Sequence, residues 1–154
     1  MNKTDQKIEE LNSDDIERVE SQRKWVREHY TPEAEHKYNT IEGKLDLLDT
    51  IISRKWIEAT ETYKLQCLGV TIGDALAQKL GMIWVAVDDE YERTPALSFS
   101  LADTSIIVFP TTMISKRIER GKKVDVRELF DGICEMIKEQ MEDIAEQTSG
   151  ADGV

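Results

Sequence analysis

The sequence predicts an α+β fold in which several helices pack on one face of a three-stranded antiparallel meander and a long C-terminal helix ends the domain. The main observation is a change of hydrophobic period. Apolar residues recur every three or four positions up to Gly81, every second position from Ile83 to Phe109, and every three or four positions afterwards. The stretches between the alternating segments are too short for a parallel crossover, which favours antiparallel strands.

Length and composition predict a single domain over residues 13–147, with flexible ends at 1–12 and 148–154. The longest apolar runs are strand-sized and the N-terminus has no apolar signal region, which is not typical of membrane or secreted proteins. Cys67 and Cys134 fall within helical patterns and form no CxxC pair. We therefore expect a cytoplasmic protein with reduced thiols.

Three helices are expected before the strongest helical segment. The first begins at Ser13, which is predicted to be its N-cap, and runs to about Tyr30. The second begins at Thr31 as N-cap, with Pro32 at its first position. The third is predicted from one apolar stripe with helical spacing: Ile41, Leu45, Leu48, Ile52 and Trp56.

The strongest helical pattern covers residues 61–80 and ends at Gly81, where a left-handed residue is expected. Gly69 and Gly73 lie four positions apart on its apolar stripe. Because a glycine inside a helix costs about 1 kcal/mol relative to alanine, we expect another element to approach the helix closely at these two positions.

The first predicted strand carries Val85 on one face and Trp84 on the other, so that Trp84 either covers the second face of the sheet or marks a contact surface. The second strand includes Leu97–Leu101. The third is the SIIVF segment, which Pro110 ends. One face of this sheet is predicted to be packed and the other to be largely polar.

A short helix is predicted in the segment TTMISKRIER and ends at Gly121. Asp125 is the predicted N-cap of the last helix, and Glu128 stands at the capping-box spacing. The apolar stripe of that helix is formed by Leu129, Phe130, Ile133, Ile137, Met141 and Ile144.

An acidic segment follows the first strand and supplies oxygen ligands of the kind that calcium or magnesium prefers. It contains Asp88, Asp89, Glu90 and Glu92. The order of ligands found in an EF-hand is absent, and acids are also common where an exposed strand ends. We interpret the segment as the turn that leads into the second strand.

The other residues with reactive side chains do not form a motif. His29 and His36 are separated by a predicted helix boundary, so a zinc site is not favoured. Cys67 and Cys134 are interpreted as inert core thiols. No nucleophile elbow, phosphate-binding loop or dinucleotide-binding motif occurs. We therefore expect no metal and no cofactor, and we favour a protein that is not an enzyme.

Basic residues are concentrated in the segment 115–127, although the whole chain has a formal charge of -11. They are Lys116, Arg117, Arg120, Lys122, Lys123 and Arg127. One interpretation is a patch that binds an anion or an acidic partner, helped by Thr111 and Thr112 at a helix start. The other, which we favour, is an intramolecular one in which this segment complements the acidic face of the last helix.

The segments LGVTIGDALAQKLGMIWVAVDDE, PAL and VFPTTMISKRIERGKKVDVRELF occur in that order, and together they resemble an uncharacterised bacterial family known as domain of unknown function 3806. The resemblance covers about residues 60–140. It implies an α+β domain of helices and a small sheet, and it implies no activity. Residues 1–40 show no such match.

Three functional hypotheses follow, and the net negative charge argues against nucleic acid as a partner for any of them. The first is a non-enzymatic protein-interaction or regulatory domain. The second is an acidic immunity-type protein that neutralises a basic toxin. The third is a small-anion binder or enzyme that uses the helix start at 111–117. The candidate binding residues are Trp84, Asp88, Asp89, Glu90, Thr111, Thr112, Lys116 and Arg117.

Overall fold

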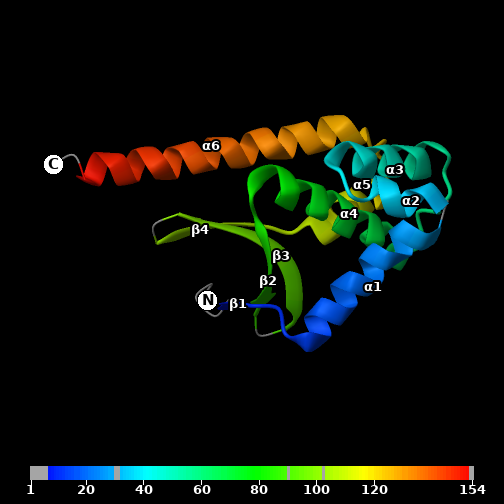
Figure 1. Ribbon diagram of the computed structural model, residues 1–154, viewed down its shortest axis with the longest axis horizontal. Helices are drawn as coiled ribbons and strands as arrows, with labels where there is room; N and C mark the ends of the chain where they lie inside the picture. Colours follow the sequence, from blue (N-terminus) through cyan, green and yellow to red (C-terminus); the bar gives the residue numbers. More distant parts are fainter. Residues whose placement is uncertain (1–6, 30–31, 90, 102, 153–154) are drawn as a thin grey trace.

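The computed structural model describes residues 7–29, 32–89, 91–101 and 103–152. Helices lie over one side of a curled sheet, and the last helix extends beyond the other helices (Figure 1). In chain order the elements are β1 (Lys7–Glu9), α1 (Ser13–His29), α2 (Pro32–Lys37), α3 (Ile41–Ser53), α4 (Thr62–Leu80), β2 (Ile83–Asp88), β3 (Arg93–Leu101), β4 (Thr104–Val108), the 3-10 helix η2 (Pro110–Thr112), α5 (Met113–Glu119) and α6 (Val126–Asp152).

The sheet has the strand order β1-β2-β3-β4, and all neighbouring strands are antiparallel. The α+β class and the antiparallel meander are confirmed, but the predicted strand count was one too low. The additional strand β1 pairs Ile8 with Val87 and lies within the segment 1–12 that was expected to be flexible. At the other end α6 continues to Asp152, into the expected tail, while residues 1–6 and 153–154 lie outside the described part of the chain.

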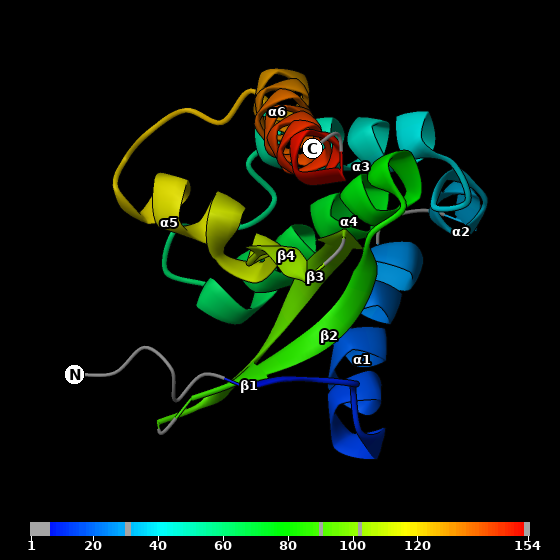
Figure 2. The same ribbon diagram turned by 90° about the vertical axis from the view of Figure 1, so that its left-hand side faces the viewer.

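The helix α4 is central, as Figure 2 shows by its position between α6 and the sheet. It contacts α1, α3, α5, α6 and η2. Leu65, Leu68 and Ile72 of α4 are at most 1% exposed and belong to the main hydrophobic core. The inner face of the sheet adds Leu97 and Ile106 to that core, since side chains alternate between the two faces along each strand.

The close approach expected at the two glycines of α4 is confirmed. A Cβ atom on Gly69 would lie 2.2 Å from the carbonyl oxygen of Thr111 in η2, and one on Gly73 would lie 2.7 Å from the Trp84 ring. Both distances are too short for real Cβ contacts. The turn that follows β4 therefore lies directly against the backbone of α4.

Several local predictions need correction. Asn12 caps α1 in place of Ser13, because its side-chain oxygen accepts from the Asp15 amide at 2.9 Å. The predicted cap Thr31 lies outside the described residues, and α2 begins at Pro32 as expected. The helix α3 ends at Ser53, so Trp56, which is 42% exposed, lies beyond it.

The two faces of the sheet are also different from the prediction. Trp84 lies on the inner face, where it packs against the main core. The outer face is not largely polar at its centre, since Val85, Val87 and Ala96 form a second buried cluster with Ile107 beside it. Trp84 therefore contributes to the core and not to an outer contact surface.

Arg93 at the start of β3 contacts side chains of three other elements, namely β1, β2 and α1. Its Nε atom donates to Asp15 Oδ2 at 2.9 Å, and its guanidinium also forms ion pairs with Glu9 and Asp88. The hydrogen bond from Arg93 is the main reason that the pKa of the Asp15 carboxyl is lowered. Arg93 thus holds β1, the start of α1 and the β2–β3 turn together.

The contact at Gly69 predicts opposite effects for two glycine substitutions. Gly69→Ala places a methyl group against the η2 backbone and should lower the free energy of unfolding by about 1–3 kcal/mol. Gly132→Ala in α6 is the control, because a Cβ there meets nothing within 4 Å and alanine favours a helix by about 1 kcal/mol. Urea unfolding followed by circular dichroism measures both. A Gly69→Ala protein as stable as Gly132→Ala would contradict the close contact.

The Arg93 cluster predicts a pH-dependent stability. Because the pKa of Asp15 is lowered in the folded state, its contribution is fully present above the ordinary carboxyl pKa and is lost as the pH falls through the folded value. Arg93→Gln should therefore lower the urea midpoint more at pH 7 than at pH 3. Lys24→Gln, on an exposed part of α1, should change neither midpoint. An Arg93→Gln effect that is equal at both pH values would contradict the assignment.

Candidate functional site

The acidic segment after β2 forms a turn whose hydrogen bonds are internal. The Asp89 carboxylate accepts from the Tyr91 and Glu92 amides at 2.8 and 2.9 Å, and these bonds lower its pKa. Asp88 lies 3.5 Å from Arg93 at the opposite strand, and Glu90 lies outside the described residues. The segment is thus built as a turn, in agreement with its interpretation from the sequence.

A polar cluster that the sequence analysis did not identify surrounds Asp74 of α4. The Asp74 carboxylate accepts two hydrogen bonds from Arg23 of α1, at 2.6 and 2.8 Å. It also accepts from the Tyr38 hydroxyl at 2.5 Å and from the Trp84 indole N–H at 2.9 Å. The Asp74 side chain is 11% exposed and the Arg23 side chain 22% exposed.

The acceptor sites of the Asp74 carboxylate are occupied by these protein donors, which leaves little room for a ligand to bind them. Burial is the main cause of the raised pKa of Tyr38, and burial also lowers the pKa of the neighbouring Lys44. The Lys44 Nζ atom donates to Gln78 Oε1 at 2.8 Å and lies 5.1 Å from the Tyr38 ring centre. We conclude that this cluster fixes α1, α3 and α4 against β2.

The basic residues of α5 and the following turn surround a pocket of about 300 Å³, here called the basic pocket. Its lining is formed by Phe109, Thr112, Met113, Lys116, Arg117, Arg120 and Lys122. It therefore contains four positive side chains and no acidic one. Within the described part of the chain none of these four cations forms an ion pair within 4 Å.

Among the described residues no ion pair within 4 Å joins the basic segment to an acid of α6, although Arg117 and Lys123 line one cavity together with Glu128 of that helix. The favoured intramolecular interpretation therefore stays a prediction. Arg127 does pair within the molecule, but with Glu42 at 2.6 Å and Asp46 at 2.8 Å, which belong to α3.

The other basic side chains of the segment are exposed or half-buried, with no such partner among the residues described. Lys116 and Arg120 are exposed, and the Arg117 guanidinium donates one hydrogen bond, to the Met113 carbonyl at 3.0 Å, so its remaining donors can bind an anion.

The candidate residues from the sequence are separated into four locations. Thr112, Lys116 and Arg117 line the basic pocket. Thr111 lies within η2, is 8% exposed and packs its backbone against Gly69, and its buried hydroxyl oxygen has no hydrogen-bond partner among the described residues. Trp84 is in the core, and Asp88 and Asp89 are at the β2–β3 turn. The pocket thus uses the helical segment after β4 without the acidic turn.

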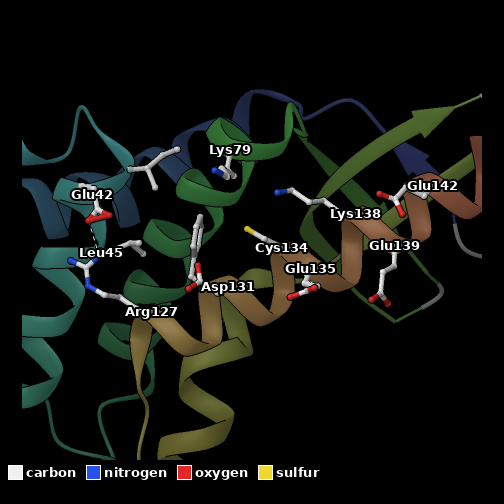
Figure 3. A pocket seen from close by; sticks show the side chains of 12 residues that line it. Glu42, Leu45, Lys79, Arg127, Asp131, Cys134, Glu135, Lys138, Glu139 and Glu142 are labelled. Atoms are coloured by element: carbon white, nitrogen blue, oxygen red, sulfur yellow. Dashed lines mark hydrogen bonds and ion pairs between the residues drawn. The ribbon is translucent and has the colours of Figure 1, made fainter.

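A second cavity, of about 770 Å³, lies between α3, the end of α4 and α6 (Figure 3). Its charges are mixed, and acids such as Asp131 and Glu135 outnumber the cations Lys79, Arg127 and Lys138. Figure 3 shows the Cys134 sulfur and the Lys138 amine on the side of α6 that faces Lys79. Burial raises the pKa of the Cys134 thiol, so the thiol is a weak nucleophile at neutral pH.

The other thiol, Cys67, is fully buried in α4, and burial raises its pKa to about 11. It is an inert core thiol, as expected. In the described ranges no group of three His, Cys, Asp or Glu side chains has the geometry to hold a metal ion. No helix among those residues is sufficiently long and apolar to cross a membrane.

The comparisons with known proteins support the fold and state no activity. A family model described as Domain of unknown function (DUF3806) matches residues 44–130, which is more than half of the chain. A crystal structure of a protein from Bacteroides thetaiotaomicron VPI-5482, at 1.50 Å resolution, superposes with a TM-score of 0.65 at 14% sequence identity. It covers 83% of this chain, while this chain spans only 47% of that protein. No curated protein matches significantly.

The Asp74 cluster predicts a large loss of stability for a small substitution. Asp74→Asn removes the charge that neutralises the partly buried Arg23 and should lower the free energy of unfolding by about 3 kcal/mol. Asp46→Asn is the matched control, because the exposed Asp46–Arg127 pair should contribute less than about 1 kcal/mol. Chemical denaturation measures both values. Equal effects of the two substitutions would contradict the assigned importance of the cluster.

Proposed function

Since the chain belongs to the DUF3806 family, whose description states no activity, we propose its function from the geometry: it is a binding domain that recognises an anionic group in the basic pocket. The observation that carries this proposal is the set of four cations around one small concavity, none of which forms an ion pair within 4 Å with a residue that the structure describes. All of the lining residues lie within the segment that matches the family.

The concentration of positive charge at this pocket is unusual, because the protein as a whole is acidic. Six of the 20 basic residues lie in the segment 116–127, in a protein with 31 acidic residues. Lys116 and Arg117 lie in the last turn of α5 and Arg120 is its C-cap, and an anion bound between like charges reduces the repulsion among them. The volume of 300 Å³ suits a small group such as a phosphate or a short carboxylate, and Phe109 adds an apolar wall.

The chemistry of the pocket favours binding over catalysis. Guanidinium and ammonium groups donate charge-assisted hydrogen bonds to anionic oxygens. The pocket lining includes no carboxylate, imidazole or thiol that would serve as a general base. We therefore propose a specific version of the interaction-domain hypothesis, in which the partner or ligand binds through an anionic group. The immunity-type hypothesis stays a prediction, since it requires a basic partner that this pocket would repel.

The proposal predicts specific stabilisation by inorganic pyrophosphate. At 10 mM pyrophosphate the melting temperature should rise by about 2–4 °C relative to chloride at equal ionic strength, because a ligand that binds only the folded state stabilises it. The double variant Lys116→Gln/Arg120→Gln should lose this shift. Lys24→Gln/Lys37→Gln removes the same charge elsewhere and should keep it. A shift of equal size in both variants, or no shift in the native protein, would refute the proposal.

A further inference from the structure

A third cavity, distinct from the basic pocket, lies between the connection that follows α3 and the connection that follows α5. Its volume is about 1160 Å³, and here it is called the α3–α5 cavity. It ends against Ile51, Leu65 and Leu68, which are at most 1% exposed and belong to the main core. Its walls include Ile57, Ile118 and Val124, so most of its interior is apolar.

The charged lining of the α3–α5 cavity is mixed, with four cations and three acids. Lys55, Lys122 and Lys123 line the cavity, and each of these residues is exposed. Within the described chain no ion pair within 4 Å involves any of the three.

Three acids line the same cavity. Asp49 lies 3.6 Å from Arg127, and Asp125 accepts from the Glu128 amide at 3.1 Å. Glu58 is exposed and forms no ion pair within 4 Å among the described residues, so it is the acid that an anion would have to avoid.

Lys55 lines the cavity, and its backbone has a strained, left-handed conformation. The Lys55 amide donates to Ile52 at 3.1 Å and the Trp56 amide donates to Ile51 at 3.2 Å, which is the Schellman pattern that ends a helix. The left-handed residue of this pattern is normally glycine. Lys55 occupies it with φ 53°, and it is the one non-glycine residue with positive φ in the described ranges.

The helix α5 ends in the same pattern with the usual residue. There Gly121 has φ 74°, its amide donates to Ile118 at 2.9 Å, and the Lys122 amide donates to Arg117 at 3.0 Å. Both helix ends line the α3–α5 cavity. One end keeps the unstrained glycine and the other accepts a strained lysine, and strain of this kind is found at sites where a side chain has a function.

From these observations we propose that the α3–α5 cavity binds an amphipathic anion, with an alkyl chain against Ile57, Ile118 and the core residues and an anionic head group at Lys55 and Lys123. Burial of the chain supplies affinity in proportion to the apolar area removed from water. The lysines supply the charge complementarity that selects an anion. The inference does not depend on the basic pocket, with which the cavity shares only Lys122 and the neighbouring turn.

The test uses decanoate as the probe and isothermal titration calorimetry as the measurement. Decanoate should bind the full chain with a Kd below about 1 mM, whereas butyrate and 1-decanol should each bind at least about tenfold more weakly, because one lacks the chain and the other lacks the charge. Equal affinity for 1-decanol, or no binding of decanoate, would overturn the proposal. So would sedimentation showing that the chain self-associates, together with calorimetry showing that self-association prevents the binding of decanoate.

The Lys55→Gly variant tests whether Lys55 binds the ligand or has only a structural role at the end of α3. Because glycine relieves the strain, its urea midpoint should rise by roughly 0.5 M, while its affinity for decanoate should fall at least about fivefold. Gly132→Ala should also raise the midpoint but leave the decanoate affinity unchanged, and Lys24→Gln should change neither. An unchanged decanoate affinity in Lys55→Gly overturns the assignment. The pyrophosphate response of Lys55→Gly should remain native, so failure here is distinguishable from failure of the basic pocket.

Discussion

The fold depends on the contact between the backbone of α4 at Gly69 and the backbone of η2 at Thr111. No side chain separates the two segments at this point, since a Cβ atom on Gly69 would lie within 2.2 Å of a carbonyl oxygen. The contact fixes where the chain leaves β4. It thereby positions α5 and the basic residues that follow it, together with the cavity formed between α3 and α5. Both proposed binding sites therefore depend on a pair of glycines in a buried helix.

Much of this architecture follows from patterns in the sequence. The change of period at Gly81 locates the end of α4 and the start of the sheet, because a helix and a strand bury every third or fourth and every second residue respectively. The glycine pair indicates a close approach before its partner is known. The strand β1 was missed, since a three-residue strand with exposed side chains carries almost no periodic signal. The cap at Asn12 shows that adjacent polar residues compete for the same position.

The sites were predicted less completely than the fold, for physical reasons. The Asp74 cluster joins Arg23, Tyr38 and Trp84, which are far apart in the chain, and no local spacing indicates that they meet. The basic pocket was partly foreseen, because its cations lie close together in sequence. The α3–α5 cavity was missed because Trp56 extends the apolar stripe beyond the true end of α3. Nothing in the sequence alone indicates that Lys55 adopts a left-handed conformation.

The helix α1 is held to the family segment by two arginine clusters, one at its start and one near its middle. Arg93 binds Asp15 at its first turn, and Asp74 binds Arg23 two turns later. Both clusters connect residues outside 44–130 with residues inside that range. The strand β1 and the helix α1 are thus held to the family segment by these side chains. The amide hydrogens of these two elements should exchange with solvent as one cooperative unit, before those of α4, since loss of either arginine contact weakens the other.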